Sequence, residues 1–206
     1  MFDDTRKRPV LEPNSVVSEE YGACHSRNGE VIAGVRIEVG GRKVTDTLFG
    51  NRFNDCVVRL KSGSWTSTIL RECKFEDCLI WPARMISSGT WNADFLGCKF
   101  KGRWSTRIDG RFEDCDLSEA KIDYLALISS AGTGTIWPAF PHVVLQQIHE
   151  HYLEWRETPV LKDLSKAYIG PRVRAAMVIM DLSRYFDDPK LAWEQLKDKP
   201  WAFRAD

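Results

Sequence analysis

A five-residue repeat runs from Leu48 to Ile122 and constrains the fold more than any other feature of this 206-residue chain. Each repeat places a large apolar side chain two positions after a small or short polar one. The large positions are Leu48, Phe53, Val58, Leu70, Phe75, Ile80, Phe95, Phe100, Phe112, Leu117 and Ile122. A period of five matches neither the period of a helix (about 3.6 residues) nor that of a strand (about two residues). It fits a coil with four short sides.

The repeats form sets that recur along the chain at a nearly constant offset. The first and second sets are 22 residues apart, the second and third 20, and the third and fourth 22, counting from Phe95 to Leu117. Such an offset is typical of a solenoid, whose units bury their inward faces by stacking on their neighbours. Four five-residue sides need only 20 residues, so the surplus predicts bulged corners around Lys61–Thr66 and Lys101–Arg107.

Three stretches of the repeat, CKFEDCLI, NADFLGCKF and RFEDCDLSEAKI, resemble the pentapeptide-repeat family. Units of that family carry a central Leu or Phe with a small residue two positions before it. The resemblance covers about a third of the chain and implies a right-handed quadrilateral β-helix, here of about four coils. This sequence departs from the family pattern in using Cys-Lys-Phe and Glu-Asp-Cys where Ala-Asp/Asn-Leu is usual.

We predict a mainly β fold with some α-structure, organised in five segments. A polar segment (1–24) precedes a strand-rich cap (25–45), in which the alternation EVIAGVRIEV predicts a strand. A cap is expected because the open end of a coil is an unpaired strand edge. The β-helix occupies 46–124, and Ser, Gly and Pro mark 125–141 as a connector.

The last segment (142–206) is predicted to be helical. Apolar residues recur there at helical spacing on two faces, namely Val144, Ile148, Tyr152 and Trp155, then Val173, Met177 and Met180. Pro171 and Asp188-Pro189 are typical of helix starts, with Asp188 as the cap and Pro189 in the first turn. We therefore expect three or four helices packed against the solenoid.

Composition excludes several classes of function. Lys plus Arg equals Asp plus Glu at 29 each, so no global field directs the chain toward nucleic acid or an anionic membrane. The first 20 residues have no apolar core typical of a signal peptide, and no stretch approaches the roughly 20 apolar residues that a membrane span needs. We expect a cytoplasmic protein.

Five of the six cysteines occupy the small inward position of the repeat: Cys56, Cys73, Cys78, Cys98 and Cys115. Because Cys73 and Cys78 fall on successive sides rather than in a CxxC pair, we interpret these residues as buried free thiols. Cys24 has no assigned role. Abundant thiols also agree with a reducing compartment.

Candidate catalytic chemistry is sparse. His142, His149 and His151 cluster, with His142 and His149 one heptad apart, but a polar helix face is favoured over a metal site because a third convergent ligand is missing. Gly132–Thr135 lacks the lysine of a phosphate loop and is interpreted as a flexible linker. The sequence therefore predicts no enzyme, no catalytic residue, no bound metal and no cofactor.

Tryptophan and arginine side chains indicate a binding surface. Trp81 and Trp91 directly follow central positions and should point outward, whereas Trp65 and Trp104 fall in the expected bulges. We predict a partner-binding set made of Trp65, Trp81, Arg84, Trp91, Arg103, Trp104 and Arg107. Exposed Trp beside Arg is typical of the centre of a protein interface. The alternative is that the terminal segments cover these tryptophans.

The function predicted from these features is protein binding without catalysis. Its most specific form is an immunity protein that binds and sterically inhibits a bacterial toxin acting in the cytoplasm. The resemblance implies an alternative, a DNA mimic that binds a type II topoisomerase, but residues 46–123 hold 12 acidic and 12 basic side chains rather than a long acidic rod. A metal-dependent enzyme is a remote third alternative, and the oligomeric state is left open.

Overall fold

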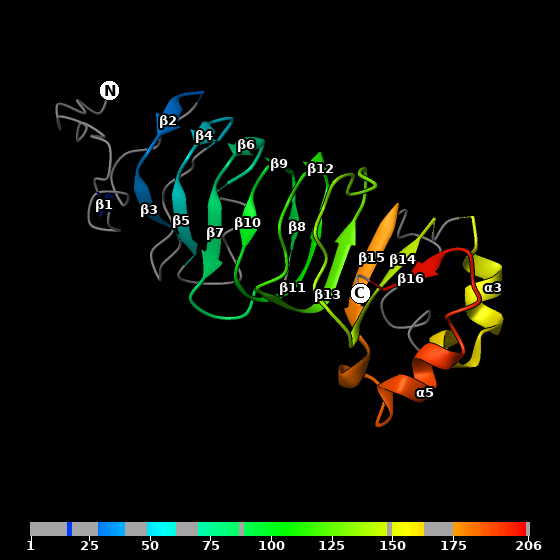
Figure 1. Cartoon of the computed structure of the whole chain (residues 1–206). Helices are drawn as coiled ribbons and strands as arrows, with labels where there is room; N and C mark the ends of the chain where they lie inside the picture. The colour runs from blue at the N-terminus through cyan, green and yellow to red at the C-terminus, as the bar shows by residue number, and fades with distance from the viewer. Residues whose placement is uncertain are drawn as a thin grey trace, which may run out of the picture.

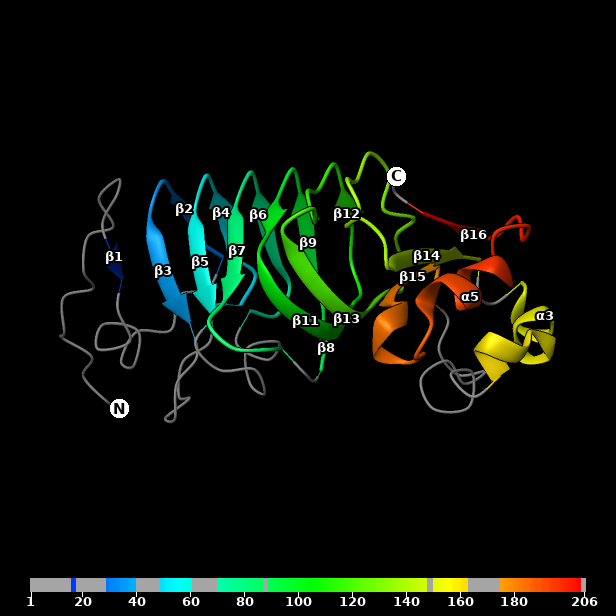
Figure 2. The same ribbon diagram turned by 60° about the horizontal axis from the view of Figure 1, so that its bottom comes forward.

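The protein is a parallel β-solenoid of about four turns, followed by a smaller C-terminal unit (Figure 1). The computed structural model describes residues 16–17, 29–39, 49–60, 70–86, 89–147, 150–162 and 175–204. Cys24, Trp65, His149, Pro171 and the corner predicted at 61–66 lie outside these residues. Figure 2 shows the C-terminal unit at the end of the solenoid opposite β1 (Val16–Val17).

Two parallel sheets form successive sides of the solenoid. Sheet A contains β1, β3 (Arg36–Val39), β5 (Val57–Leu60), β7 (Leu79–Pro82) and β10 (Lys99–Phe100). Sheet B contains β2 (Val31–Ala33), β4 (Arg52–Asn54), β6 (Cys73–Glu76), β9 (Ala93–Leu96) and β12 (Phe112–Glu113). The strands of these two sheets are at most four residues long, because each side of a coil carries only one repeat.

The third sheet joins the solenoid to the C-terminal unit. In sheet C, β8 (Thr90–Trp91), β11 (Gly102–Ile108) and β13 (Ala120–Leu127) are parallel. The sheet then continues with antiparallel pairings through β15 (Met177–Asp181), β14 (His142–Gln146) and β16 (Ala202–Phe203). One continuous sheet therefore holds the two parts of the molecule together.

The interior of the solenoid contains the predicted column of phenylalanines. The rings of Phe53 and Phe75 stack at 4.8 Å and 8°, and those of Phe75 and Phe95 at 5.0 Å and 7°. The fourth member is Phe112, paired with Phe95, and not Leu117 as the sequence pattern indicated. Leu117 is also buried, but on the next side of the coil. Phe112 takes the fourth place in the column because it follows Phe95 by only 17 residues.

This short step changes how the coil closes. The chain passes from β9 through β10 and the seven-residue strand β11 to β12, which makes three sides. The bulged corner predicted at 101–107 is therefore wrong, because these residues form β11. The alternation of β11 then decides which of its side chains face the interior.

The recurring Asp-Cys and Gly-Cys pairs mark the corner between sheets B and A. Asp55, Asp77 and Asp114 have φ near +50° there, and Gly97 has the same left-handed conformation. Asp tolerates this region better than most residues. A Cβ on Gly97 would lie 2.4 Å from the Asp77 carboxylate, so a larger residue at that rung would have to displace the Asp77 side chain. The Asp-Cys and Gly-Cys pairs of the sequence thus correspond to this turn.

The segment predicted as a connector instead closes the end of the solenoid. Residues 125–127 extend β13, and Asp114 N–H donates to Thr133 O at 2.8 Å while Leu117 N–H donates to Ile136 O at 2.8 Å. Trp137 packs on the end of the core. Gly132, at φ +62°, allows this approach, since a Cβ there would lie 2.5 Å from the Trp137 ring. The flexible linker predicted at 132–135 is therefore an ordered part of the last rung.

The C-terminal unit contains strands as well as the expected short helices. Asp188 accepts the Lys190 and Leu191 N–H groups at the start of α5 (Pro189–Glu194), which confirms that helix start. The helices predicted around Val144 and around Met177 are wrong, since β14 and β15 occupy these positions. Their apolar runs are buried on both faces, and such runs do not distinguish a strand from a helix.

A second core lies on the outer face of sheet C. Tyr124 and Ala126 of β13 face it, whereas Leu125 and Leu127 face the solenoid interior. The short helices α3 (Tyr152–Glu157) and α5 cover this face with η1 (Leu182–Arg184), and Trp155 is completely buried. Within the ranges given above, no helix is long and apolar enough to cross a membrane.

Candidate partner-binding surface

The structure separates the tryptophans that the sequence pattern placed on one surface. Trp91 and Trp104 are only 1% and 2% exposed, and their rings lie 6.1 Å apart inside the solenoid. The predictions that Trp91 points outward and that Trp104 lies in a bulged corner of the binding surface are therefore wrong. On β11 the alternation turns Trp104 inward, where its Nε1–H donates to Lys101 O at 2.9 Å. Trp91 pairs with the buried Ile108 and shares its inward position.

Trp81 is exposed as predicted. It lies on β7, directly after the buried Ile80, and 44% of its surface is accessible on the outer face of sheet A. The guanidinium of Arg59, its cross-strand neighbour on β5, sits 5.4 Å from the centre of the indole ring. This cation–π contact restrains the indole while leaving nearly half of it accessible.

Trp81 borders the corner at which the chain passes from sheet A to sheet C. Arg84 and Met85 follow β7 at this corner, and both are exposed. Ile86 N–H donates to Arg103 O at 3.0 Å, which brings Met85 beside Arg103, and Arg103 pairs in register with Lys121. We call this surface the A–C edge, and it consists of Trp81, Arg84, Met85, Arg103 and Lys121.

Arg103 is fixed in place by an ion pair. Its Nε and Nη2 donate to the two carboxylate oxygens of Asp123 at 3.1 and 2.8 Å. Arg184 reaches the same carboxylate from η1 at 3.2 Å, and Tyr185 donates to Asp123 O at 3.4 Å. Asp123 is the extra residue where the pairing of β11 with β13 shifts register, so its side chain is turned toward both arginines.

Three of the predicted residues therefore belong to one continuous surface, namely Trp81, Arg84 and Arg103. Arg107 is also exposed, farther along β11. Sequence reasoning missed Lys121, Asp123 and Arg184. The alternation of inward and outward residues along β13 could have predicted the exposure of Lys121. Asp123 and Arg184 could not have been found in this way. The register shift that orients Asp123 and the long sequence separation of Arg184 produce no local sequence pattern.

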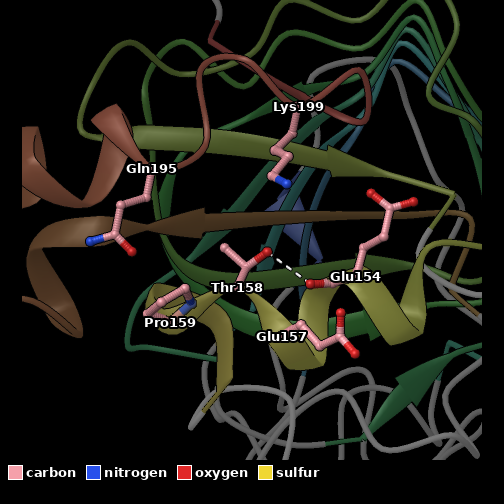
Figure 3. A pocket seen from close by; sticks show the side chains of 6 residues that line it. All are labelled: Glu154, Glu157, Thr158, Pro159, Gln195 and Lys199. Carbon is pink, nitrogen blue, oxygen red and sulfur yellow. Dashed lines mark hydrogen bonds between the residues drawn. The ribbon is translucent and has the colours of Figure 1, made fainter.

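An open hollow of about 500 Å³ lies on the C-terminal unit (Figure 3). Its lining residues are Glu154, Glu157, Thr158, Pro159, Gln195 and Lys199. Trp201 Nε1–H donates to the Glu154 carboxylate at 3.0 Å, and His151 Nδ1 contacts its other oxygen at 2.9 Å. These two contacts lower the pKa of Glu154. The Thr158 hydroxyl donates to a main-chain carbonyl, so this lining offers no nucleophile beside a base.

The histidines that the sequence clustered occupy different places. His142 lies on β14, where its Nδ1 contacts Ala139 O at 2.9 Å and its Nε2 accepts the Ile122 N–H at 3.3 Å. His151 precedes α3 and contacts Glu154. Among the described residues, no three His, Cys, Asp or Glu side chains are grouped as metal ligands.

Four cysteines form a buried column along the corner between sheets B and A. Each thiol of Cys56, Cys78, Cys98 and Cys115 donates to a main-chain carbonyl of the preceding coil, at 3.2 to 3.5 Å. All four, and Cys73, are buried free thiols, which confirms the inward position. Burial raises the pKa of Cys73 to about 11. The bond with Cys115, together with burial, raises that of Cys98 to about 12.

We expect these five thiols to be unreactive in the folded protein. A thiol with a pKa of about 11 or 12 is almost wholly protonated at pH 8, and only the thiolate attacks a disulfide reagent. Reaction of Cys73 and Cys98 with an aromatic disulfide at pH 8 should therefore proceed at least about a hundredfold more slowly in native buffer than in denaturant. Rapid reaction of Cys73 or Cys98 without unfolding would contradict the buried column.

No family model, curated protein or solved structure matches the chain. The functional assignment therefore depends on the geometry of the surface and on the sequence pattern.

Proposed function

We propose that the protein is a non-enzymatic member of the pentapeptide-repeat class that binds another protein through the A–C edge. The observation that carries this proposal is Trp81, a large aromatic side chain held by Arg59 on the outside of a rigid sheet. Trp and Arg are enriched among the residues that dominate interface energies. The strands of the stacked solenoid are also held in register. The backbone that carries these side chains therefore loses little conformational entropy on binding.

In its most specific form, the proposal is an immunity protein that occludes the active cleft of a toxin in the cytoplasm of a bacterium. The fixed Arg103 and the exposed Arg84 beside Trp81 suit steric capping of a partner surface. The alternative topoisomerase-binding DNA mimic is less favoured. Sheet B alternates charge on its outer face, with Lys74 beside Glu76 and Arg111 beside Glu113, whereas duplex mimicry needs a continuous acidic surface.

The test is a comparison of wild type with Trp81→Ala. Tagged protein is used to isolate its partner from the native cell, and the affinity of the purified pair is measured by calorimetry. We expect Trp81→Ala to weaken the complex by about 2 kcal/mol or more, roughly thirtyfold, with the melting temperature almost unchanged. If the partner is a toxin, cells carrying the variant should lose protection.

Leu191→Ala is the matched control, because Leu191 is 62% exposed on α5 and lies on the C-terminal unit. It should leave the affinity within about twofold. A complex equally tight with Trp81→Ala would contradict binding through the A–C edge. Inhibition of supercoiling by the wild-type protein, without a toxin partner, would instead support the topoisomerase alternative.

A further inference from the structure

The A–C edge carries an excess of positive charge although the whole chain is neutral. Only part of this charge is balanced by nearby carboxylates. Lys99 and Lys101 are paired with Asp116 and Glu119, so these four side chains are neutral together. Asp123 is shared by Arg103 and Arg184 and can neutralise only one of them. The exposed Arg84 and Lys121 add further positive charge, so the surface keeps a local positive field.

The arrangement of these cations matches carboxylate groups. Arg103 and Lys121 lie directly opposite each other on adjacent strands, about 4.8 Å apart in the pairing direction. Arg103 already holds one carboxylate in a two-pronged geometry, and 39% of its side chain is still accessible. Guanidinium groups bind carboxylates through paired N–H donors. The exposed Met85 and Trp81 provide apolar contact next to the charges.

We propose that the partner of the A–C edge is an acidic protein surface that presents Asp or Glu side chains beside an apolar residue. This inference rests on the proposed function and specifies the chemistry of its partner. Nucleic acid fits the observations less well. A phosphate-binding domain is typically strongly basic, whereas this chain has equal numbers of acidic and basic side chains and a pI of about 6.9.

The test uses a fluorescein-labelled peptide of about a dozen residues that alternates Glu with Leu, and a labelled DNA duplex of about a dozen base pairs, with fluorescence anisotropy as the readout. The full chain should bind the peptide at low salt, more tightly than the duplex, and lose most of this binding at about 0.5 M salt. The double variant Arg84→Glu, Lys121→Glu should weaken peptide binding by about tenfold or more.

Arg52→Glu, Lys190→Glu is the control, because it changes net charge equally at exposed sites on sheet B and on α5. It should change peptide affinity by less than about twofold. Neutral Arg84→Gln, Lys121→Gln guards against misfolding and should cause an intermediate loss with an unchanged circular dichroism spectrum. Three results would each overturn the acidic-partner assignment: an equal effect of the two charge-reversed variants, tighter binding of the duplex than of the peptide, and no binding of the peptide. A protein complex that depends on Trp81 but not on Arg84 or salt would leave the proposed function standing.

Discussion

Replacing Phe75 with Ala is expected to lower the free energy of unfolding by about 3 to 5 kcal/mol. Phe75 is fully buried, and its ring stacks between those of Phe53 and Phe95 at 4.8 and 5.0 Å. The hydrogen-bonded ladders of sheet B hold β4, β6 and β9 apart at strand spacing, so the coils cannot collapse into the vacated space. The loss should appear in urea denaturation as a lower midpoint.

The variant should also weaken one part of the molecule more than the rest. Each coil of a solenoid contacts only its neighbours, so a cavity at β6 uncouples the turns before it from the turns after it. Amide exchange should therefore rise most in 29–39 and 49–60. Leu96→Ala, on the outer face of β9, is the control and should cost about 1 kcal/mol or less. Equal losses for the two variants would contradict the stacked interior.

The inward face of the solenoid could be predicted from sequence because the repeat is a local pattern. Phe75 and Cys73 are both buried, as their spacing indicated. The length of each coil was harder to predict. The step from Phe95 to Phe112 is shorter than the repeat average, and the pattern instead indicated Leu117, five residues later, as the successor to Phe95.

The error at Phe112 explains the error at Trp104. Counting from Leu117 made residues 101–107 a bulge, whereas counting from Phe112 makes them a strand with Trp104 inside. Trp81 was predicted correctly because it directly follows the inward Ile80 within β7. Of the C-terminal strands, β15 pairs with β13 and β14 pairs with β15, and no local period records these contacts between segments distant in sequence.

The residues of the exposed surface could be predicted only in part from local sequence patterns. Arg84 lies only two residues after β7, so its exposure could be predicted from the local sequence. Arg184 joins Asp123 only because β15 pairs with β13 and η1 then turns back toward β11. The positive charge of the A–C edge therefore arises from tertiary structure and could not be predicted from composition, which gives a net charge of zero for the whole chain.

Replacing Trp104 with Ala is expected to destabilise the fold by about 3 to 5 kcal/mol, which is the opposite of what an exposed interface residue would show. Trp104 is 2% exposed, its ring lies 5.2 Å from that of Phe100, and its indole N–H bond to Lys101 O would be lost. Thermal and urea unfolding should report the loss. Trp81→Ala, measured in parallel, should cost less than about 1 kcal/mol because Trp81 is 44% exposed.

The pair of variants separates stability from recognition. Partner affinity of the folded fraction should be lost with Trp81→Ala and retained with Trp104→Ala, once measured at a temperature where the Trp104 variant is still native. A Trp104 variant of normal stability that no longer binds its partner would show that β11 is turned over, with Trp104 on the surface. Such a result would reverse the inward and outward positions of the strand, and with them the placement of Arg103 on the A–C edge.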